Sequence, residues 1–199
     1  MTYDLEDSVA EHMKPAARSA LLNHLRSLPS QHGFGEVAVR INALSTPHAT
    51  NDLRAVASSP IVGAIVIPKV QTAADISLVE DIIRFAAPDR PIKLLALIES
   101  AKAVVNLNAI CAASPRLEGL IFAAEDYALD MSLTRSTAMT EMLYARSAVA
   151  TAARAFEMES AIDVVCTKFR GPEAEEAFLE ECRNGKALGF NGKREWSCF

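Results

Sequence analysis

The chain has 199 residues, half of them apolar, and carries a formal net charge of −5. This length and apolar content suit one domain, residues 1–199, with a sizeable core. The charged residues are spread along the chain without a basic stripe, which argues against nucleic acid as the main partner. An anionic substrate would therefore need local help from arginine, lysine or a metal ion.

The four cysteines lie at positions 111, 166, 182 and 198 and form no CxxC pair. This spacing favours reduced thiols in an intracellular protein over a disulfide framework. No apolar run reaches the roughly 18 residues that a membrane span needs. No signal-peptide pattern follows Met1, since Asp4, Glu6 and Asp7 come almost at once. We expect a cytoplasmic protein without a membrane partner, or a mitochondrial one if a targeting segment precedes residue 1.

Short apolar runs that predict β-strands recur at intervals of roughly 25 to 40 residues. In chain order they are Tyr3–Leu5, Glu36–Ile41, Ala64–Pro68, Lys93–Ile98, Gly119–Phe122, Ile162–Val165 and a weaker candidate, Lys186–Phe190. The runs are nearly unbroken, as expected for strands of a parallel sheet that is buried on both faces.

Segments with apolar residues three or four positions apart predict helices between these strands. The predicted helices are Ser19–Leu28, Ala73–Ala87, Glu141–Glu157 and Glu173–Arg183. Pro15, Asp75 and Pro172 lie near helix starts, where proline and acidic residues are favoured. The segment 44–51, rich in Ser, Thr and Pro, is interpreted as a loop.

This alternation of strands and helices predicts an α/β fold with a parallel sheet. An open doubly wound sheet and a closed (β/α)8 TIM barrel both fit the pattern. The doubly wound sheet most often carries a glycine-rich phosphate loop, but neither GxGxxG nor GxxxxGK[ST] occurs among the eight glycines of this chain. The sequence therefore favours the TIM barrel.

Six predicted strands carry charged residues at or near their ends, which are Asp4, Glu6, Asp7, Arg40, Lys69, Glu99, Glu125, Asp126 and Asp163. In such barrels the active site lies at the carboxyl ends of the strands, so we expect these charges to point towards one mouth of the barrel. Glu99 comes directly after the apolar run Leu94–Ile98, so burial should desolvate its carboxylate unless a cation pairs with it. Asp126 ends the next strand and should be a neighbour. Two carboxylates with room for water suit Mg²⁺ better than Zn²⁺. The alternative is that both are ordinary helix-capping acids.

Arg40 follows the apolar run Val37–Val39 at the end of the second predicted strand. A guanidinium in this place can bind a carboxylate with two parallel hydrogen bonds. The alternative is a structural ion pair with one of the acids at the same rim.

Nine short motifs resemble, in order and at similar spacing, the HpcH/HpaI aldolase and citrate lyase beta-subunit family, which includes citramalyl-CoA and malyl-CoA lyase-like proteins. They are Asp4–Val9, Lys14–Arg18, Val39–Asn42, Ile67–Val70, Ala96–Ser100, Ala124–Tyr127, Tyr144–Ser147, Ala161–Asp163 and Gly189–Lys193. A single one of these matches is weakly specific, but nine in order over nearly the whole chain are strongly so.

The resemblance implies a TIM barrel that assembles as a homo-oligomer, a trimer or hexamer. It implies that Glu99 and Asp126 hold Mg²⁺ and that Glu99 also acts at the substrate. It implies that Arg40 grips the substrate carboxylate and takes part in catalysis, and that Ile162 and Asp163 lie near an acyl-CoA. The implied reaction is the cleavage or formation of a 3-hydroxyacyl-CoA such as citryl-CoA, malyl-CoA or citramalyl-CoA, which gives acetyl-CoA and an oxo acid.

The chain departs from this family at both ends. Family members have a strand and a helix before the motif at Asp4, and after Lys193 they continue with an Ile-His-Pro stretch and a catalytic aspartate that is lent to a neighbouring subunit. We therefore expect an incomplete barrel that lacks the first strand and the C-terminal extension. Two alternatives stay open: a class II aldolase that acts on a free 2-oxo acid, and an inactive barrel fragment or interaction subunit.

Overall fold

The computed structural model describes residues 1–28, 35–167 and 170–194 of the chain. Within these residues seven parallel strands form one sheet, and each strand pairs with the next one along the chain. The strands are β1 (Thr2–Asp4), β2 (Ala38–Arg40), β3 (Ala64–Ile67), β4 (Lys93–Ile98), β5 (Leu117–Phe122), β6 (Ser160–Val165) and β7 (Gly192–Arg194).

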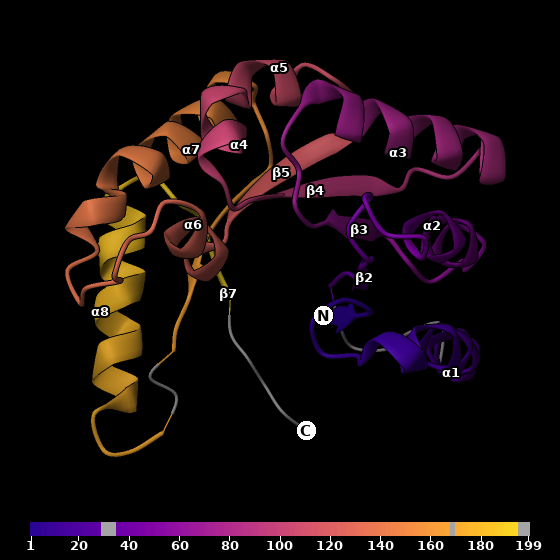
Figure 1. The fold of residues 1–199 in the computed structure, drawn as a ribbon, viewed down its shortest axis with the longest axis horizontal. Helices are drawn as coiled ribbons and strands as arrows, with labels where there is room; N and C mark the ends of the chain where they lie inside the picture. Colours follow the sequence, from indigo (N-terminus) through magenta and orange to yellow (C-terminus); the bar gives the residue numbers. More distant parts are fainter. Residues whose placement is uncertain (29–34, 168–169, 195–199) are drawn as a thin grey trace.

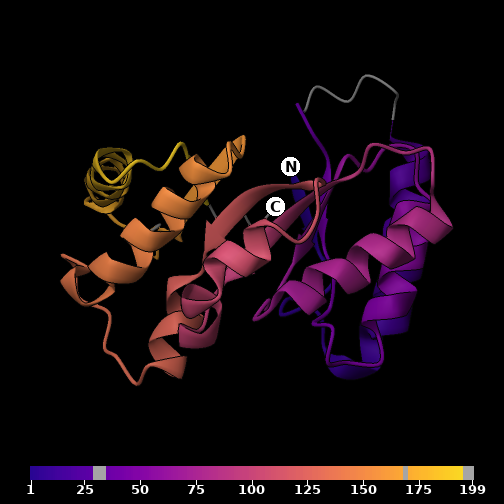
Figure 2. The same cartoon turned by 90° about the horizontal axis from the view of Figure 1, so that it is seen from above.

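Helices connect the strands and cover the outer, convex face of the sheet (Figure 1). They are α1 (Lys14–Ser27), α2 (Ala49–Ala57), α3 (Ala73–Ala86), α4 (Ala101–Val105), α5 (Leu107–Cys111), α6 (Ala124–Asp130), α7 (Leu143–Ala155) and α8 (Ala174–Ala187), with short 3-10 turns η1 (Glu11–Met13) and η2 (Thr140–Met142). Seen from above, α3, α4, α5 and α7 lie across the outside of the strands (Figure 2).

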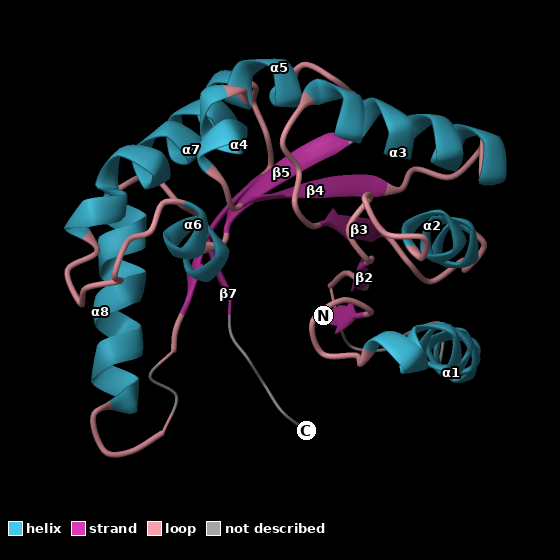
Figure 3. Cartoon of the chain, in the orientation of Figure 1, coloured by secondary structure: helices cyan, strands magenta, loops and turns pink. Residues whose placement is uncertain are grey.

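The sheet curves into an open half-barrel, with strands inside and helices outside (Figure 3). β1 and β7 are its two edge strands. The predicted incomplete TIM-barrel fold is thereby confirmed. Because all the strands run parallel, their carboxyl ends meet at one rim, where a barrel carries its functional groups.

Side chains alternate between the two faces of each strand. The outer face packs against the helices in the main apolar core, as Val39, Ile65 and Phe122 show. A smaller apolar cluster covers the inner face. It consists of Ala38, Ala64, Val66, Leu97, Ile121 and Ala123, with Leu95 and Ile162 packed against it. Most positions of the inner face are small or aliphatic, and charged groups stand at the ends of the strands, with Arg40 at the carboxyl rim and Lys93 at the start of β4.

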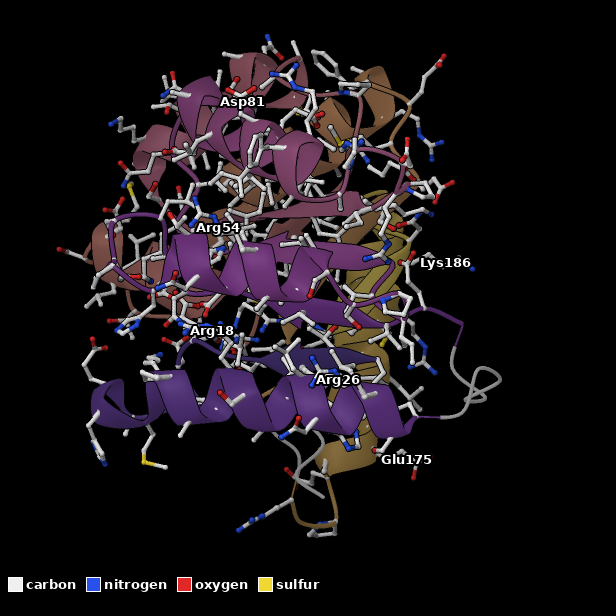
Figure 4. The ribbon with its side chains drawn as sticks, turned by 90° about the vertical axis from the view of Figure 1, so that its right-hand side faces the viewer. Arg18, Arg26, Arg54, Asp81, Glu175 and Lys186 are labelled. Carbon is white, nitrogen blue, oxygen red and sulfur yellow. The ribbon has the colours of Figure 1, made fainter. Side chains whose placement is uncertain are left out.

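A buried carboxylate fixes the chain just beyond β2. Asp52 on α2 is fully buried and accepts a hydrogen bond of 2.6 Å from Arg18 Nε on α1. It also accepts hydrogen bonds from the backbone N–H and the side-chain amide of Asn42, at 3.0 and 2.6 Å. Arg18 lies where α1 and α2 face each other (Figure 4). Asp52 therefore anchors the residues that follow Arg40 to two helices.

The long predicted helices are confirmed, with shifts at their ends. Helix α3 begins after Thr72, and its capping box joins Thr72 and Asp75. Helix α1 begins earlier than predicted, at Lys14, with Pro15 in its first turn. The segment predicted as Glu141–Glu157 divides into η2 and α7.

The weak seventh strand candidate was wrong. Residues 186 and 187 end α8, and Gly189 then adopts a φ of +100°, a conformation that lets the chain leave the helix. The seventh strand lies further on, at Gly192–Arg194. Helices α2, α4, α5 and α6 were not predicted, and α2 overlaps the segment interpreted as a loop.

Cys111 and Cys182 are free thiols, and no disulfide joins the three described cysteines, Cys111, Cys166 and Cys182. Cys198 lies outside the described residues. In the part of the chain that the structure describes, no helix combines the length and apolar character needed to cross a membrane.

Candidate active site at the strand ends

Three adjacent strand ends bring Glu99, Lys69 and Asp126 together. Glu99 directly follows β4 and is only 5% exposed. It accepts a hydrogen bond from the backbone N–H of Lys69, which follows β3. Asp126 lies in the first turn of α6, just after β5. The predicted proximity of Glu99 and Asp126 is therefore present in the structure.

The Lys69 ammonium lies between the two carboxylates. Its Nζ is 3.1 Å from Asp126 Oδ1 and 3.9 Å from Glu99 Oε1. The Lys69 backbone has a φ of 53°, which is uncommon for a residue other than glycine. Such conformations persist where the surroundings enforce them, often at functional sites. Here the turn directs both the N–H and the ammonium of one residue at the carboxylate pair.

Burial raises the pKa of Glu99 to about 7. The Lys69 charge and backbone N–H oppose this rise, while the charge of Asp126 and a hydrogen bond with it add to it. A further cation beside this carboxylate would lower its pKa again, because a positive charge stabilises the ionised form.

The donor set at this rim fits Mg²⁺. Glu99 and Asp126 offer only oxygen atoms, and Mg²⁺ commonly takes one or two carboxylates with water and substrate oxygens as its other ligands. The described residues contain no group of three or more His, Cys, Asp or Glu that could hold a metal ion. The remaining ligands would thus come from solvent and substrate. The metal role of Glu99 and Asp126 stays a prediction.

A second cluster surrounds Arg40 at the end of β2. Asp4 accepts hydrogen bonds from Arg40 Nε and Nη2, at 2.7 and 2.6 Å. Arg40 Nη1 lies 3.0 Å from Asp7 Oδ2 and 3.1 Å from Glu6 Oε2. In the structure Arg40 therefore forms ion pairs with acids of the same rim, as the alternative interpretation predicted. Its contact with a substrate carboxylate stays a prediction.

The acids around Arg40 differ in their proton affinity. Burial raises the pKa of Asp4, but hydrogen bonds from Arg40 and Ser8 and the Arg40 charge outweigh it, so that this pKa falls to about 2. Burial raises the pKa of Glu6 to about 7, although Arg40 opposes the rise. The charges of Glu99 and Lys69 also act on the pKa of Glu6, so the two clusters influence each other electrostatically.

The sequence pointed to Asp4, Glu6 and Lys69 only as charges at strand ends, not as members of the site. Lys14 was missed altogether as a contributor. Its buried ammonium donates to the carbonyl oxygens of Leu5 and Glu6, at 3.0 and 2.5 Å, and so fixes the turn after β1. The motif that begins at Lys14 was the only sequence signal for this role.

Ile162 and Asp163 lie on opposite faces of β6. Ile162 packs against the inner apolar cluster. The Asp163 carboxylate points into the helical layer, where Arg146 Nη2 on α7 lies 2.6 Å from Asp163 Oδ2 and both side chains are 1% exposed. The prediction that Asp163 points towards the mouth is wrong, because side-chain alternation sends it outward. A substrate role for either residue stays a prediction.

The carboxylate pair opens into a cavity of about 280 Å³ lined by Lys69, Gln71, Glu99, Ser100, Asp126, Leu129 and Asp130. A larger cavity of about 530 Å³ lies between the segment 135–139 and α8. Arg135 borders this larger cavity and donates hydrogen bonds to Glu125 and to the carbonyl oxygen of Val165. Arg135 thus connects the β5 and β6 ends of the rim.

A parallel half-barrel with paired carboxylates and an arginine at its carboxyl rim is the class of protein that the fold and the site define. Residues 1–196 match the family model described as HpcH/HpaI aldolase/citrate lyase. The chain belongs to this family.

Curated relatives include citrate lyase subunit beta of Leuconostoc mesenteroides subsp. cremoris, which is 38% identical over 196 residues, covering 96% of this chain and 63% of that protein. The mitochondrial citramalyl-CoA lyase of Homo sapiens is 29% identical over 204 residues, covering 96% of this chain and 58% of that protein. The chain therefore spans about three fifths of the length of these two relatives.

Among solved structures, the citrate lyase beta subunit of Mycobacterium tuberculosis complexed with oxaloacetate and magnesium matches with a TM-score of 0.76 and 30% identity, covering 98% of this chain and 80% of that chain. RipC of Yersinia pestis matches with a TM-score of 0.80 and 27% identity, covering 98% of this chain and 82% of that chain. The structure of protein CitE from Mycobacterium tuberculosis in complex with magnesium, acetoacetate and coenzyme A matches with a TM-score of 0.78 and 30% identity, covering 98% of this chain and 67% of that chain.

Proposed function

We propose that the chain is a magnesium-dependent carbon–carbon lyase that cleaves or forms a 3-hydroxyacyl-CoA such as citryl-CoA, malyl-CoA or citramalyl-CoA. The observation that carries this proposal is the buried Glu99 carboxylate, which shares a cavity with Asp126 at adjacent strand ends. Relatives whose structures contain magnesium with an oxo acid or coenzyme A support it.

In this proposal Glu99 and Asp126 hold Mg²⁺. When bound, the ion supplies a Lewis acid for the oxygens of a 2-oxo or 2-hydroxy acid. Arg40 orients the acid group and offsets its charge. Asp4 fixes the Arg40 guanidinium through two hydrogen bonds, while Asp7, whose side chain is 59% exposed, is the partner that a substrate carboxylate can replace at least cost.

During cleavage, the bond between the hydroxyl-bearing carbon and the thioester α-carbon breaks. Its electron pair passes to the thioester, which becomes an enolate, while the hydroxyl group loses its proton and becomes the carbonyl of the oxo acid. The enolate then takes up a proton to give acetyl-CoA. In the condensing direction the same steps run in reverse.

The test is acetyl-CoA release from citryl-CoA, malyl-CoA and citramalyl-CoA, measured with Mg²⁺ and with EDTA. We expect magnesium-dependent cleavage of one thioester and its loss in Glu99→Gln. Asp81→Asn is the matched control, because Asp81 is an exposed acid on α3 whose Arg84 partner is also exposed (Figure 4). It should retain activity.

Cleavage of a free 2-oxo acid without the CoA moiety would favour the class II aldolase alternative. No cleavage by folded protein across the panel would refute the lyase proposal and favour a non-catalytic barrel. A cytoplasmic location and a homo-oligomeric state stay predictions.

A further inference from the structure

Lys69 brings a positive charge to the carboxylate pair of the candidate site. Its Nζ lies 3.1 Å from Asp126 Oδ1, to which it donates a hydrogen bond, and 3.9 Å from Glu99 Oε1. One ammonium therefore offsets part of the negative charge of two carboxylates that would otherwise repel each other. This is the same pair that the proposed function assigns to Mg²⁺.

The position of the Lys69 ammonium conflicts with a dication on the same two oxygens. Mg²⁺ binds carboxylate oxygens at about 2.1 Å, which is shorter than either distance from Lys69 Nζ to those oxygens. An ion held by both carboxylates would therefore lie beside the ammonium, and two cations so close together repel each other. The ammonium and the ion therefore compete for Glu99 and Asp126.

The Lys69 side chain can move while its backbone stays in place. The side chain is 46% exposed and borders the cavity of about 280 Å³ at this rim. Its charge is carried on a flexible four-carbon stem, whereas the hydrogen bond to Glu99 comes from the backbone N–H. The Asp130 carboxylate lines the same cavity, so an acidic neighbour remains for a displaced ammonium.

We propose that Lys69 sets the metal affinity of this site, because its ammonium competes with Mg²⁺ for Glu99 and Asp126 and turns into the cavity when the ion binds. This inference rests on the proposed function, since it concerns the same metal ion. It assigns opposite roles to neighbouring residues: the two carboxylates favour the binding of the ion, and the lysine between them opposes it.

The test is calorimetric titration of the full chain with Mg²⁺ at a fixed pH. Lys69→Met keeps the length of the side chain but removes its charge, so Mg²⁺ should bind about 3- to 10-fold more tightly. Lys69→Arg keeps the charge and should bind Mg²⁺ no more tightly than the unmodified chain. Lys186→Met is the control, because it removes an exposed cation at the end of α8 (Figure 4), and it should leave the affinity unchanged.

Thermal unfolding gives a second measurement of the same competition. In EDTA, Lys69→Met leaves the two carboxylates without the ammonium between them, so this variant should melt at a lower temperature than the unmodified chain. Excess Mg²⁺ should then raise the melting temperature of the variant more than that of the unmodified chain, because the variant binds the ion more tightly.

Unchanged or weaker Mg²⁺ binding by Lys69→Met would overturn the inference and leave the metal site standing, provided that the unmodified chain binds Mg²⁺ and Glu99→Gln does not. If Lys69→Met does not fold by circular dichroism, the neutral variant Lys69→Gln decides. Failure of both the unmodified chain and Lys69→Met to bind Mg²⁺ would instead refute the proposed function, and with it this inference.

Discussion

The buried pair of Arg146 and Asp163 gives a sharp test of how the half-barrel is held together. Arg146 donates to both Asp163 oxygens, at 3.1 and 2.6 Å, and to Asn184 Oδ1 at 2.8 Å. Its guanidinium carbon also lies 6.0 Å from the centre of the Phe190 ring. One side chain thus ties α7 to β6, α8 and the turn before β7.

Arg146→Met leaves the Asp163 carboxylate buried without its cation. Removal of one partner of a buried ion pair costs about 3–5 kcal/mol in the free energy of unfolding. For a domain of this size that loss corresponds to a fall in melting temperature of roughly 6–20 °C. The upper part of this range applies if α8 cannot move to admit water, and the lower part applies if it can.

Urea unfolding followed by far-ultraviolet circular dichroism measures the effect in Arg146→Met, Asp163→Asn and the double variant. We expect the double variant to be more stable than the sum of the two single losses predicts, by about 2 kcal/mol, because these residues interact directly. Arg154→Met, an exposed position on the same helix, should stay within about 0.5 kcal/mol of the unmodified chain.

A loss below about 1 kcal/mol in Arg146→Met, or strictly additive losses, would refute the idea that this pair joins the helices to the sheet. An Asp163→Asn variant of unchanged stability but weakened acyl-CoA binding would restore the substrate role that the sequence suggested for Asp163.

Three other predictions concern the sheet and its rim. Glu6, with its pKa raised to about 7 from an ordinary 4.5, contributes stability that is complete below pH 4.5 and lost as the pH rises through 7. Urea unfolding of Glu6→Gln should therefore lack this decline, which amounts to about 3 kcal/mol at most, and parallel pH profiles would contradict the prediction. Gly119→Ala would place a Cβ 2.5 Å from Leu95 Cδ2 and should lower stability by about 1–3 kcal/mol in thermal unfolding, whereas a neutral effect would mean that Leu95 can move aside. Asp7→Asn should remove an exposed carboxylate that competes with the substrate for Arg40, and so lower the KM for an acid substrate by up to about 5-fold with little change in kcat. A raised KM would contradict the idea that the substrate carboxylate replaces Asp7.

The sequence was a good guide where burial and element order decide the outcome. The apolar run before Glu99 predicted a desolvated carboxylate, and the structure places it 5% exposed beside Asp126. The carboxyl ends of parallel strands lie at one rim regardless of how the side chains pack. The proximity of these two residues could therefore be predicted from the order of the strands alone.

The sequence could not decide which face of a strand a residue occupies near an irregularity. Ile162 and Asp163 were grouped as one substrate segment, yet they lie on opposite faces of β6. The Asp163 partner lies on the preceding helix, and the register between β6 and β7 shifts just after Asp163. Such a pairing depends on three-dimensional neighbours that spacing along the chain does not reveal.

The sequence did not predict the short helices or place the last strand, and the reasons are local. The short segment 186–190 suits a strand or a helix end equally well, and the positive φ of Gly189 ends the helix there. Helix α2 begins at Ala49, within a segment whose Ser, Thr and Pro content favours loops, and is held by the buried Asp52. Tertiary contacts outweigh local propensity in such cases.

The contact between Lys69 and Glu99 has a consequence for how this rim tolerates mutation. The hydrogen bond to the buried carboxylate comes from the backbone of residue 69, so it does not depend on which side chain stands there. Substitutions at this position can alter the charge next to Asp126 while the anchor of Glu99 persists. Proline is the exception, since it lacks the N–H and cannot adopt the φ of 53°. Variation at residue 69 is therefore a way to change the electrostatics of the site without dismantling it.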